Sequence, residues 1–378
     1  MKTIGLIAEY NPFHNGHLYH IQEIKRLYPD SVLILALSGS FVQRGDFSLL
    51  TKWEKTELAL RYGVDLVFEL PFAFATQSAD IFADGAIQIL EALHVDTLVF
   101  GSECHDVSLL KKLAETQLTH PDYESTVKDY LAQGNNYPTA LSKALATLIG
   151  TTIDQPNDLL GISYCKALFK RNSTMEVVTI QRTNSFHDTA IQGDIASATS
   201  IRAGLRQNKS IQAVVPKETM TYLKKARVGF DEVFPFLKHQ ILANFDHLDR
   251  YQTVDEGIEH RIQRVIYDVT SLEELIQAVK TKRYTYNKVR RMFLHILCGF
   301  TKEEAKQLKD ITYLRLLGFT IQGQRYLNKV KKDLPVPLLS KFDPLLHLEQ
   351  RVTAIYGVLN NDTFLMKQEY QQEPIHKK

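Results

Sequence analysis

Residues 1–29 read MKTIGLIAEYNPFHNGHLYHIQEIKRLYP and predict a short apolar strand, a proline-containing turn and a helix. We expect the strand over residues 4–8 and the helix over residues 16–27, so that His14 and His17 fall at the first helical turn. Histidines three residues apart lie on one face of a helix. A helix start also presents free backbone N–H groups and a partial positive charge. This corner is therefore suited to hold a phosphate group.

The alternation of strand and helix continues to about residue 210. Apolar runs predict further strands at 31–37, 65–70, 97–100 and 176–180, and the intervening segments predict helices at 52–62 and 78–93. Buried apolar strands separated by helices indicate a parallel sheet with right-handed crossovers. The expected fold class is α/β, with a Rossmann-like doubly wound parallel sheet. In such sheets ligands bind beyond the carboxyl ends of the strands.

The second half of the chain has a different pattern and charge. From residue 211 onward the periodicity is helical, so we expect a catalytic domain over 1–210 and a mainly α-helical domain over 211–378. Residues 1–210 carry 18 lysines and arginines against 23 acids, a balance of −5, whereas residues 211–378 carry 27 against 20, a balance of +7. The basic half is expected to bind a partner. The polar end QEYQQEPIHKK is expected to fray.

The densest basic segment, residues 280–291, reads KTKRYTYNKVRR and has six cations, two tyrosines and no acid. A solvated helix face is the simpler explanation of such a run taken alone. The interleaved tyrosines and the opposite charge of the two halves favour a nucleic-acid surface, where cations meet phosphates and aromatic rings stack on bases. The candidate nucleic-acid contacts are Lys282, Arg283, Lys288, Arg290 and Arg291.

Several protein classes are excluded by composition. No apolar run reaches the ~18 residues of a membrane span, and TIGLIA is too short for the core of a signal peptide. Cys104, Cys165 and Cys298 are too scattered for a disulfide framework or a structural zinc site. These features predict a cytoplasmic protein, and nothing indicates a membrane or a protein partner.

The common nucleotide fingerprints are missing. The chain has no GxxxxGK[ST] loop, and no GxGxxG follows the first strand. If a nucleotide binds, His14 and His17 must take the place of these glycine cradles. Attack on the α-phosphorus of ATP builds negative charge on the phosphate oxygens, which imidazole N–H donors and helix-start amides stabilise. A histidine pair at this spacing also fits a helix cap or a metal site.

A second candidate anion site lies in GDIASATSIRAGL, residues 193–205. Ser197 or Thr199 is expected to cap a helix, with Arg202 in its first turns. Hydroxyls and a guanidinium at a helix start suit the β- and γ-phosphates. A capped helix with a surface arginine explains this segment when it is taken alone. Together, the two corners bracket a triphosphate.

Five blocks of the sequence resemble the bacterial tRNA(Met) cytidine acetate ligase family, within the nucleotidyltransferase superfamily that carries the HxGH motif. They are, in order, AEYNPFHNGHLYHI, SGSFVQRGDFSLLTKWEK, DLVFELPF, PNDLLGISYCKAL and ASATSIR. The resemblance covers nearly all of residues 1–210 and continues more weakly through YNKVRRMFLHIL. One departure is Ala198, which stands where the superfamily pattern I-S-S-T-x-x-R has a hydroxyl.

The resemblance implies a two-step reaction. Acetate and ATP would form acetyl-adenylate, and the acetyl group would pass to the wobble cytidine of elongator tRNA(Met), giving N(4)-acetylcytidine. ATP would be the co-substrate with Mg²⁺ beside it, although no carboxylate cluster marks a protein-held metal site. The implied catalytic residues are His14, His17 and Arg202. The implied nucleotide-binding residues are Ile7, Ala8, Glu9, Tyr10, Asn11, Pro12, Phe13, His14, Asn15, Gly16, His17, Leu18, Tyr19, His20, Gly101, Asn157, Arg182, Ser197 and Thr199.

Simpler roles exist for some of these residues. Without the resemblance, Gly101 reads as a turn residue, Asn157 as a helix cap and Arg182 as an exposed cation. Arg44 suits either a bound acetate or tRNA phosphate, or a loop ion pair with Asp46.

Two other functions stay open. One is an adenylyltransferase that makes a small nucleotide cofactor, and the other is a non-catalytic RNA-binding protein with a nucleotide fold. The basic half counts against the first, since such enzymes need no large basic domain. The combination of His14, His17 and Arg202 counts against the second.

Overall fold

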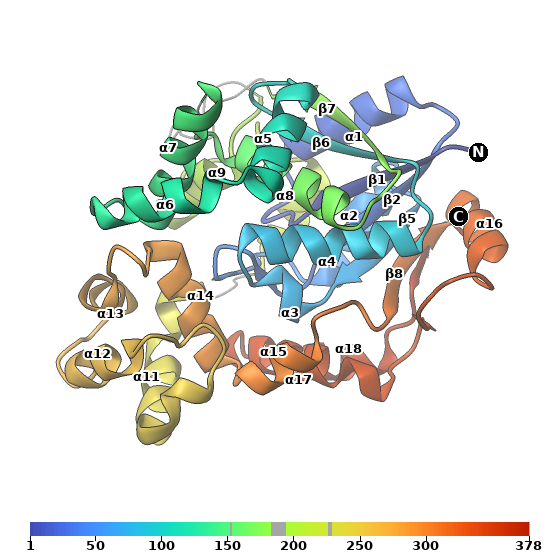
Figure 1. The fold of residues 1–378 in the computed structure, drawn as a ribbon. Helices are drawn as coiled ribbons and strands as arrows, with labels where there is room; N and C mark the ends of the chain where they lie inside the picture. Colours follow the sequence, from blue (N-terminus) through green and yellow to red (C-terminus); the bar gives the residue numbers. More distant parts are fainter. Residues whose placement is uncertain (152, 183–193, 226–228, 378) are drawn as a thin grey trace.

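The computed structural model describes residues 1–151, 153–182, 194–225 and 229–377. Its centre is a sheet in the order β10-β8-β5-β2-β1-β6-β7, flanked by helices (Figure 1). The strands of this path are β1 (Thr3–Ala8), β2 (Val32–Ser38), β5 (Leu66–Leu70), β6 (Thr97–Ser102), β7 (Glu176–Gln181), β8 (Leu314–Thr320) and β10 (Ile375–Lys377). The short strand β9 (Leu338–Leu339) pairs with β8, and β3 (Phe41–Val42) and β4 (Asp46–Phe47) form a separate hairpin.

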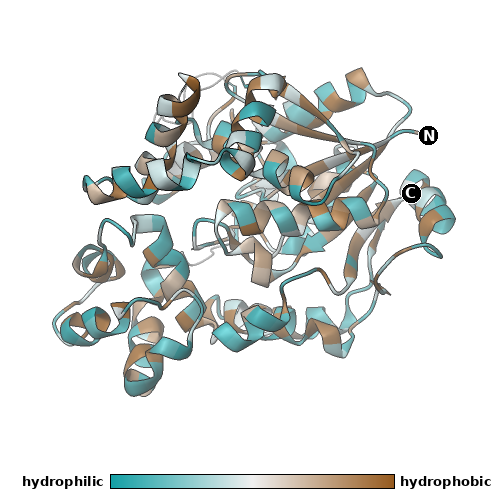
Figure 2. Ribbon diagram, in the orientation of Figure 1, coloured by the Kyte–Doolittle hydropathy of each residue, from teal (hydrophilic) through white to brown (hydrophobic). Residues whose placement is uncertain are grey.

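Helices cover the sheet on both faces, and its central strands β1, β2 and β5 are mostly apolar. Along β2, Val32 and Ile34 pack into the core shared with helix α4 (Ala79–Ala92), whereas Leu33 and Leu35 pack on the other side with α1 (Asn15–Leu27) and α2 (Lys52–Arg61). Alternate residues of a strand point to opposite faces, so a strand buried on both faces needs an uninterrupted apolar run. Figure 2 shows this apolar centre, with hydrophilic residues on the outer helices.

The predicted fold class is confirmed, and the sheet has one feature that the sequence did not suggest. Strands β5, β2, β1, β6 and β7 are parallel, as expected. The C-terminal half adds β8, which runs antiparallel to β5, and β10, which is parallel to β8. Residues 375–377 therefore pair in the sheet, and residues 368–371 belong to α18 (Phe364–Gln371), so the expectation that this end frays is wrong for both stretches.

The helices of the first half match the predicted ones to within a few residues, and three further helices lie between β6 and α8. Besides α1, α2 and α4, the helices up to residue 225 are α3 (Phe72–Ala75), α5 (Val107–Thr119), α6 (Tyr123–Ala132), α7 (Tyr137–Ile149), α8 (Pro156–Lys170), α9 (Ala198–Arg206) and α10 (Lys217–Leu223).

The second half is mainly helical. Its helices are α11 (Phe234–Ala243), α12 (Ile258–Val265), α13 (Leu272–Val279), α14 (Tyr286–Leu297), α15 (Lys302–Gln307), α16 (Ile321–Val330), α17 (His347–Leu359) and α18 (Phe364–Gln371). Helices α11 to α14 gather beside the sheet layers, and α15, α17 and α18 lie along its lower side in Figure 1. A domain boundary at residue 210 stays a prediction, since the second half also supplies strands to the common sheet. Within the described residues, no helix has the length and apolarity that a bilayer crossing requires.

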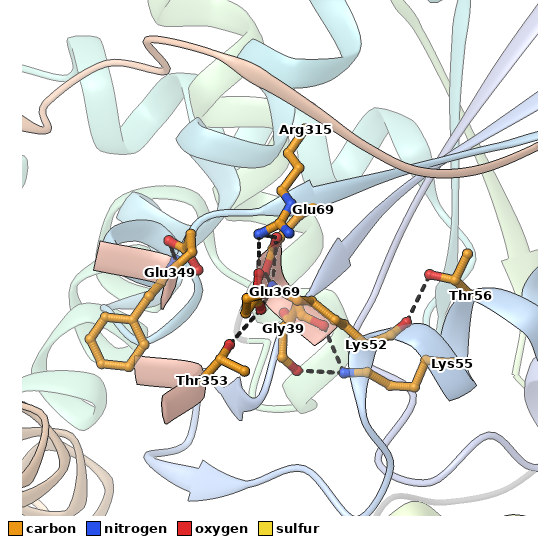
Figure 3. Close-up of polar contacts among 11 residues, drawn as sticks. Gly39, Lys52, Lys55, Thr56, Glu69, Arg315, Glu349, Thr353 and Glu369 are labelled. Carbon is orange, nitrogen blue, oxygen red and sulfur yellow. Dashed lines mark hydrogen bonds and ion pairs between the residues drawn. The ribbon is translucent and has the colours of Figure 1, made fainter. Parts of the chain in front are cut away.

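A buried network of charged side chains joins α18 to the sheet (Figure 3). Lys52 of α2 lies 2.7 Å from the carboxylate of Glu69 on β5 and also contacts Glu369 of α18. Arg315 of β8 lies 3.2 Å from Glu69 and 2.6 Å from Glu369. All four residues are buried. Because buried charges are tolerated only when they are paired and hydrogen-bonded, this network makes the docking of α18 part of the fold.

Candidate active site

The turn between β1 and α1 fixes the two histidines of the HxGH motif. His14 is the N-cap of α1, and its Nδ1 accepts a hydrogen bond from the Gly16 N–H at 3.0 Å. The Nδ1 of His17 accepts from the His14 N–H at 3.3 Å, and the two rings stack with centroids 3.7 Å apart. Because each Nδ1 accepts a hydrogen bond from a backbone N–H, it carries no hydrogen of its own. In the neutral ring the hydrogen is therefore on Nε2. The pair therefore offers two Nε2–H donors.

Burial keeps these imidazoles neutral. It lowers the pKa of His14 to about 3 and that of His20 to about 4, with Arg182 adding to both shifts, and it lowers the pKa of His17 well below its ordinary value. Neutral imidazoles among arginines donate hydrogen bonds to an anion without titrating near pH 7. The Nε2 of His20 is buried and has no hydrogen-bond partner among the described residues, which leaves a polar atom available to a ligand.

A pocket of about 440 Å³ lies beyond the carboxyl ends of β1 and β6, next to this corner. Its lining includes predicted site residues from both corners and from the β6 region, namely Ile7, Ala8, Glu9, Tyr10, Asn11, His17, His20, Gly101, Asn157, Arg182, Thr199 and Arg202. A smaller pocket of about 80 Å³ shares His17, His20, Gly101 and Arg182 with it, and is also lined by His14, Gly16, Tyr19 and Ser197.

Four of the predicted nucleotide-binding residues line neither of these pockets and have other contacts. Phe13 is buried and stacks on Tyr62 with centroids 5.4 Å apart, and Leu18 packs against the same core. Pro12 follows a cis peptide bond. The side chain of Asn15 donates to the carbonyl oxygens of Asp194 and Ala213, at 2.7 and 2.9 Å. These contacts shape the turn and attach α1 to the segments that flank α9.

The second corner meets the first one, as the sequence suggested. Ser197 is the N-cap of α9, and its Oγ accepts from the Ser200 N–H at 3.0 Å. Arg202 donates to the carbonyl oxygen of Asn11 at 2.7 Å and to Thr199 Oγ1 at 3.4 Å. The guanidinium therefore connects the start of α9 to the turn after β1, although the two segments are 191 residues apart.

The end of β6 supplies the third side of the pocket. A Cβ on Gly101 would lie 3.3 Å from Cγ of Arg182, so glycine leaves room for that side chain. Glu103, which the sequence did not single out, accepts from the Asn157 amide and lies 3.5 Å from Nε of Arg182. Asp158, also missed, accepts from the N–H groups of Glu103 and Cys104, both at 3.0 Å. The sequence does contain one sign of Asp158. The PND start of α8 places a carboxylate in the first turn of a helix.

Comparison with known proteins agrees with this geometry. Residues 1–373 match the family model described as HIGH Nucleotidyl Transferase. A tRNA(Met) cytidine acetate ligase of Geobacillus sp. (strain WCH70) is 39% identical over 399 residues, which cover 99% of this chain and 100% of the relative. The protein of that name from Caldicellulosiruptor saccharolyticus is 37% identical, with 100% and 99% covered. The chain belongs to the tRNA(Met) cytidine acetate ligase family. The resemblance noted from the sequence is thereby confirmed.

Solved structures extend the match to three dimensions. The crystal structure of Thermotoga maritima TmcAL in its apo form I has a TM-score of 0.92 to this chain at 30% identity, and covers 100% of this chain and 99% of that one. A form of the same protein bound with alpha-thio ATP has a TM-score of 0.89 at 29% identity, with the same coverage. The fold described here is therefore the fold of this family.

The basic segment 280–291 is divided between a buried face and an exposed one, which the sequence did not show. Arg290 is buried and lies 3.1 Å from Asp46 and 3.5 Å from Asp231. Arg291 donates to the carbonyl oxygen of Gln43 at 3.4 Å. Both arginines thus face the residues around the β3–β4 hairpin, and Asp46, the alternative partner considered for Arg44, contacts Arg290.

The other cations of this segment reach solvent to different degrees. Lys282 and Arg283 are exposed, and Arg283 lies 3.3 Å from Glu256. Lys288 is half-buried, with its Nζ 3.8 Å from the ring centroid of Tyr284, and that ring is itself buried. The exposed cations of the segment therefore lie at its start.

Lys55 is a buried lysine that the sequence did not single out. It hydrogen-bonds to the backbone at the edge of the pocket. The Nζ of Lys55 donates to the carbonyl oxygens of Glu9, Ser38 and Gly39 at 3.0, 2.6 and 2.7 Å, and part of this arrangement is visible in Figure 3. Burial lowers the pKa of Lys55 to about 7. Its three hydrogen bonds hold the ends of β1 and β2 together. The carboxylate of Glu9 accepts from the Gln43 N–H at 2.6 Å, and its burial raises its pKa.

Proposed function

We propose that this chain uses ATP to activate acetate and transfers the acetyl group to the wobble cytidine of elongator tRNA(Met). The observation that carries the proposal is the meeting of the HxGH turn and the α9 start in one pocket, linked by Arg202 and Asn11. The names of the full-length relatives and the nucleotide analogue bound to the Thermotoga maritima protein support it.

In the first step an acetate oxygen attacks the α-phosphorus of ATP. The bond from that phosphorus to the bridging oxygen breaks, and its electron pair leaves with pyrophosphate. The Nε2–H groups of His14 and His17, with the guanidinium of Arg202, supply donors for the charge that develops on the phosphates. The unpartnered Nε2 of His20 supports the same role. These four residue roles are proposals.

In the second step the exocyclic amine of cytidine attacks the carbonyl carbon of acetyl-adenylate. An N–C bond forms, the C–O bond to the phosphate breaks, and AMP leaves with the electron pair. The amine loses one proton, which the phosphate of AMP or solvent accepts. An anticodon loop is single-stranded, so its base enters a pocket without melting a duplex. The apolar walls of the pocket, which include Phe82, Phe100 and Leu160, would shield the adenylate from water.

We propose that Mg²⁺ accompanies ATP and is held mainly by phosphate oxygens and water. The described residues contain no group of three or more His, Cys, Asp or Glu side chains arranged to hold a metal ion. This fits the usual binding of Mg²⁺, which keeps several waters and uses few protein ligands beside phosphates. The ion would neutralise charge on pyrophosphate. A cytoplasmic location, where tRNA is found, is part of the proposal.

The direct test uses labelled acetate, ATP and total tRNA. After incubation the tRNA is digested to nucleosides, and we expect the label in N(4)-acetylcytidine from elongator tRNA(Met), with no label when ATP is omitted. Exchange of pyrophosphate into ATP should require acetate. Exchange at the same rate without a carboxylate, and no label in RNA, would instead indicate an adenylyltransferase of small nucleotides and overturn the proposal.

A further inference from the structure

The pocket that contains the HxGH turn is also lined by the first turn of α14. Tyr286, Asn287 and Arg290 of this helix share the pocket with His17 and Arg202. No feature of the phosphate chemistry requires a tyrosine and an asparagine there. Their position suggests that α14 holds a second substrate beside the nucleotide.

Tyr286 presents a fixed aromatic ring to this pocket. Its hydroxyl donates to Glu273 at 2.7 Å, and the guanidinium carbon of Arg290 lies 5.9 Å from the ring centroid. Arg290 is in turn held by Asp46 at 3.1 Å. The residue is nevertheless 37% exposed. A ring that is anchored at its edge and open on part of its surface is suited to stack on a nucleobase.

Asn287, the next residue of α14, also lines this pocket. The residue is exposed, and none of the residues that the structure describes hydrogen-bonds its side chain. A carboxamide offers one acceptor oxygen and two N–H donors. It matches the edge of cytosine, whose exocyclic amine donates and whose ring N3 accepts.

We propose that Tyr286 and Asn287 form the acceptor-base subsite, in which the cytosine stacks on the tyrosine ring while the asparagine amide orients its exocyclic amine. This inference rests on the proposed function and names where its RNA substrate enters the site. The basic residues before α14, Lys282 and Arg283, lie a few residues away along the chain, where the phosphates of an anticodon loop would follow.

The experiment compares the two half-reactions in full-length variants. Acetate-dependent pyrophosphate exchange reports nucleotide binding and activation, and acetyl transfer to an anticodon stem-loop with cytidine at the wobble position reports the subsite. The variants are Tyr286→Leu, which removes the ring, Tyr286→Phe, which removes only the hydroxyl, and Asn287→Ala. Tyr267→Leu is the matched control, because Tyr267 is 66% exposed and does not line this pocket.

We expect exchange to stay within about twofold of the parent in every variant. Transfer should fall by about fivefold to a hundredfold in Tyr286→Leu, the range for losing one base-stacking ring, with the larger part in KM for the stem-loop. The loss of transfer activity should be smaller in Tyr286→Phe than in Tyr286→Leu. Transfer should also fall in Asn287→Ala, whereas Tyr267→Leu should transfer at the rate of the parent.

Three results would overturn the subsite. Unchanged transfer in both Tyr286→Leu and Asn287→Ala would put the base elsewhere. A raised KM for ATP in exchange would assign the ring to the nucleotide. If Tyr286→Leu melts at a lower temperature and loses exchange, Asn287→Ala decides, because the Asn287 side chain is exposed and makes no hydrogen bond to any residue that the structure describes. Absence of acetate-dependent exchange in the parent would instead reject the proposed function, and the subsite with it.

Discussion

Arg202 donates to the carbonyl oxygen of Asn11 at 2.7 Å, and this contact holds together the two segments that surround the candidate triphosphate site. The guanidinium also reaches Thr199 Oγ1 at 3.4 Å. A planar fork of donors makes both contacts at once, which a lysine ammonium on a flexible stem does not reproduce. The position of this arginine is therefore set before any ligand arrives.

Arg202→Lys keeps the positive charge at this position but removes the planar guanidinium, so it tests whether the geometry of the donors matters. We expect Arg202→Lys to lower the rate of acetate-dependent pyrophosphate exchange by about 10²-fold or more, the usual cost of losing one preorganised donor to a developing oxyanion. Arg206→Ala is the control, since Arg206 lies on the same helix, is largely exposed and pairs with Asp231. Exchange in Arg202→Lys at the parent rate would remove this residue from the phosphate site.

His14 has two roles that one substitution can distinguish. Asparagine caps helices well, so His14→Asn should keep the cap of α1 and a melting temperature near that of the parent while losing the Nε2–H donor. We expect exchange to fall by about 10²-fold or more. Parent-like exchange in this variant would mean that His14 serves only as a cap. Because the pKa of His14 lies at about 3, no inflection from this ring is expected in rates measured between pH 6 and 9.

Glu349 of α17 should make stability depend on pH. Burial, followed by the neighbouring charge of Glu69, raises the pKa of Glu349 to about 8, although Lys52 acts in the opposite direction and the Phe72 N–H donates to its carboxyl at 2.8 Å. The folded protein thus keeps this proton between pH 4.5 and 8 while the unfolded chain loses it, so this group lowers stability as pH rises. Glu349→Gln does not titrate.

The test compares the stability of the parent protein with that of the Glu349→Gln variant at several pH values. The unfolding free energy of Glu349→Gln, measured with urea, should resemble that of the parent near pH 5 and exceed it increasingly up to pH 8. The difference should grow by at most roughly 1.4 kcal/mol per pH unit. A constant difference between pH 5 and 8 would contradict the raised pKa.

Breaking the buried charge network should be costly. Glu369→Ala leaves Lys52 and Arg315 with one buried carboxylate partner fewer, and removing one member of a buried ion pair typically costs about 3–5 kcal/mol. Glu373→Ala is the control, because Glu373 pairs with Lys341 on the surface, where such contacts contribute little. Equal unfolding free energies for the two variants would show that the network is not stabilising.

The exposed start of the basic segment should control RNA affinity without affecting activation. We expect the double variant Lys282→Ala and Arg283→Ala to weaken tRNA binding and to reduce the slope of log K against log salt by about 2, roughly one for each phosphate contact. Pyrophosphate exchange should be unchanged. The control replaces Lys331 and Lys332, which are exposed after α16. Equal salt slopes in both double variants would move the RNA surface elsewhere.

The sequence predicted the features that depend on local pattern. Strand and helix periodicity gave the parallel part of the sheet, and position after the first strand gave the histidine corner. The resemblance added residues such as Gly101, Asn157 and Arg182, which the structure brings to one pocket. What the sequence could not give are contacts between distant segments.

Three such contacts show why. β8 joins the sheet only because β5 offers an open edge, and no local signal encodes that pairing. Glu103 matters through Asn157 and Arg182, which lie 54 and 79 positions away along the chain. Arg290 looks like any other cation in a basic run, and its burial depends on Asp46 and Asp231. Long-range partners of this kind decide which residues of a charged run are free for a ligand.

The link between α18 and the central strands has a consequence for how the enzyme is made. Lys52 and Glu69 are synthesised well before their partner Glu369, which follows Glu69 by 300 positions along the chain. In the nascent chain Lys52 and Glu69 can pair with each other, but Arg315 and Glu369 complete the network only after the later segments have been made. A copy that terminates before Glu369 should therefore lack part of this buried network and remain less tightly packed.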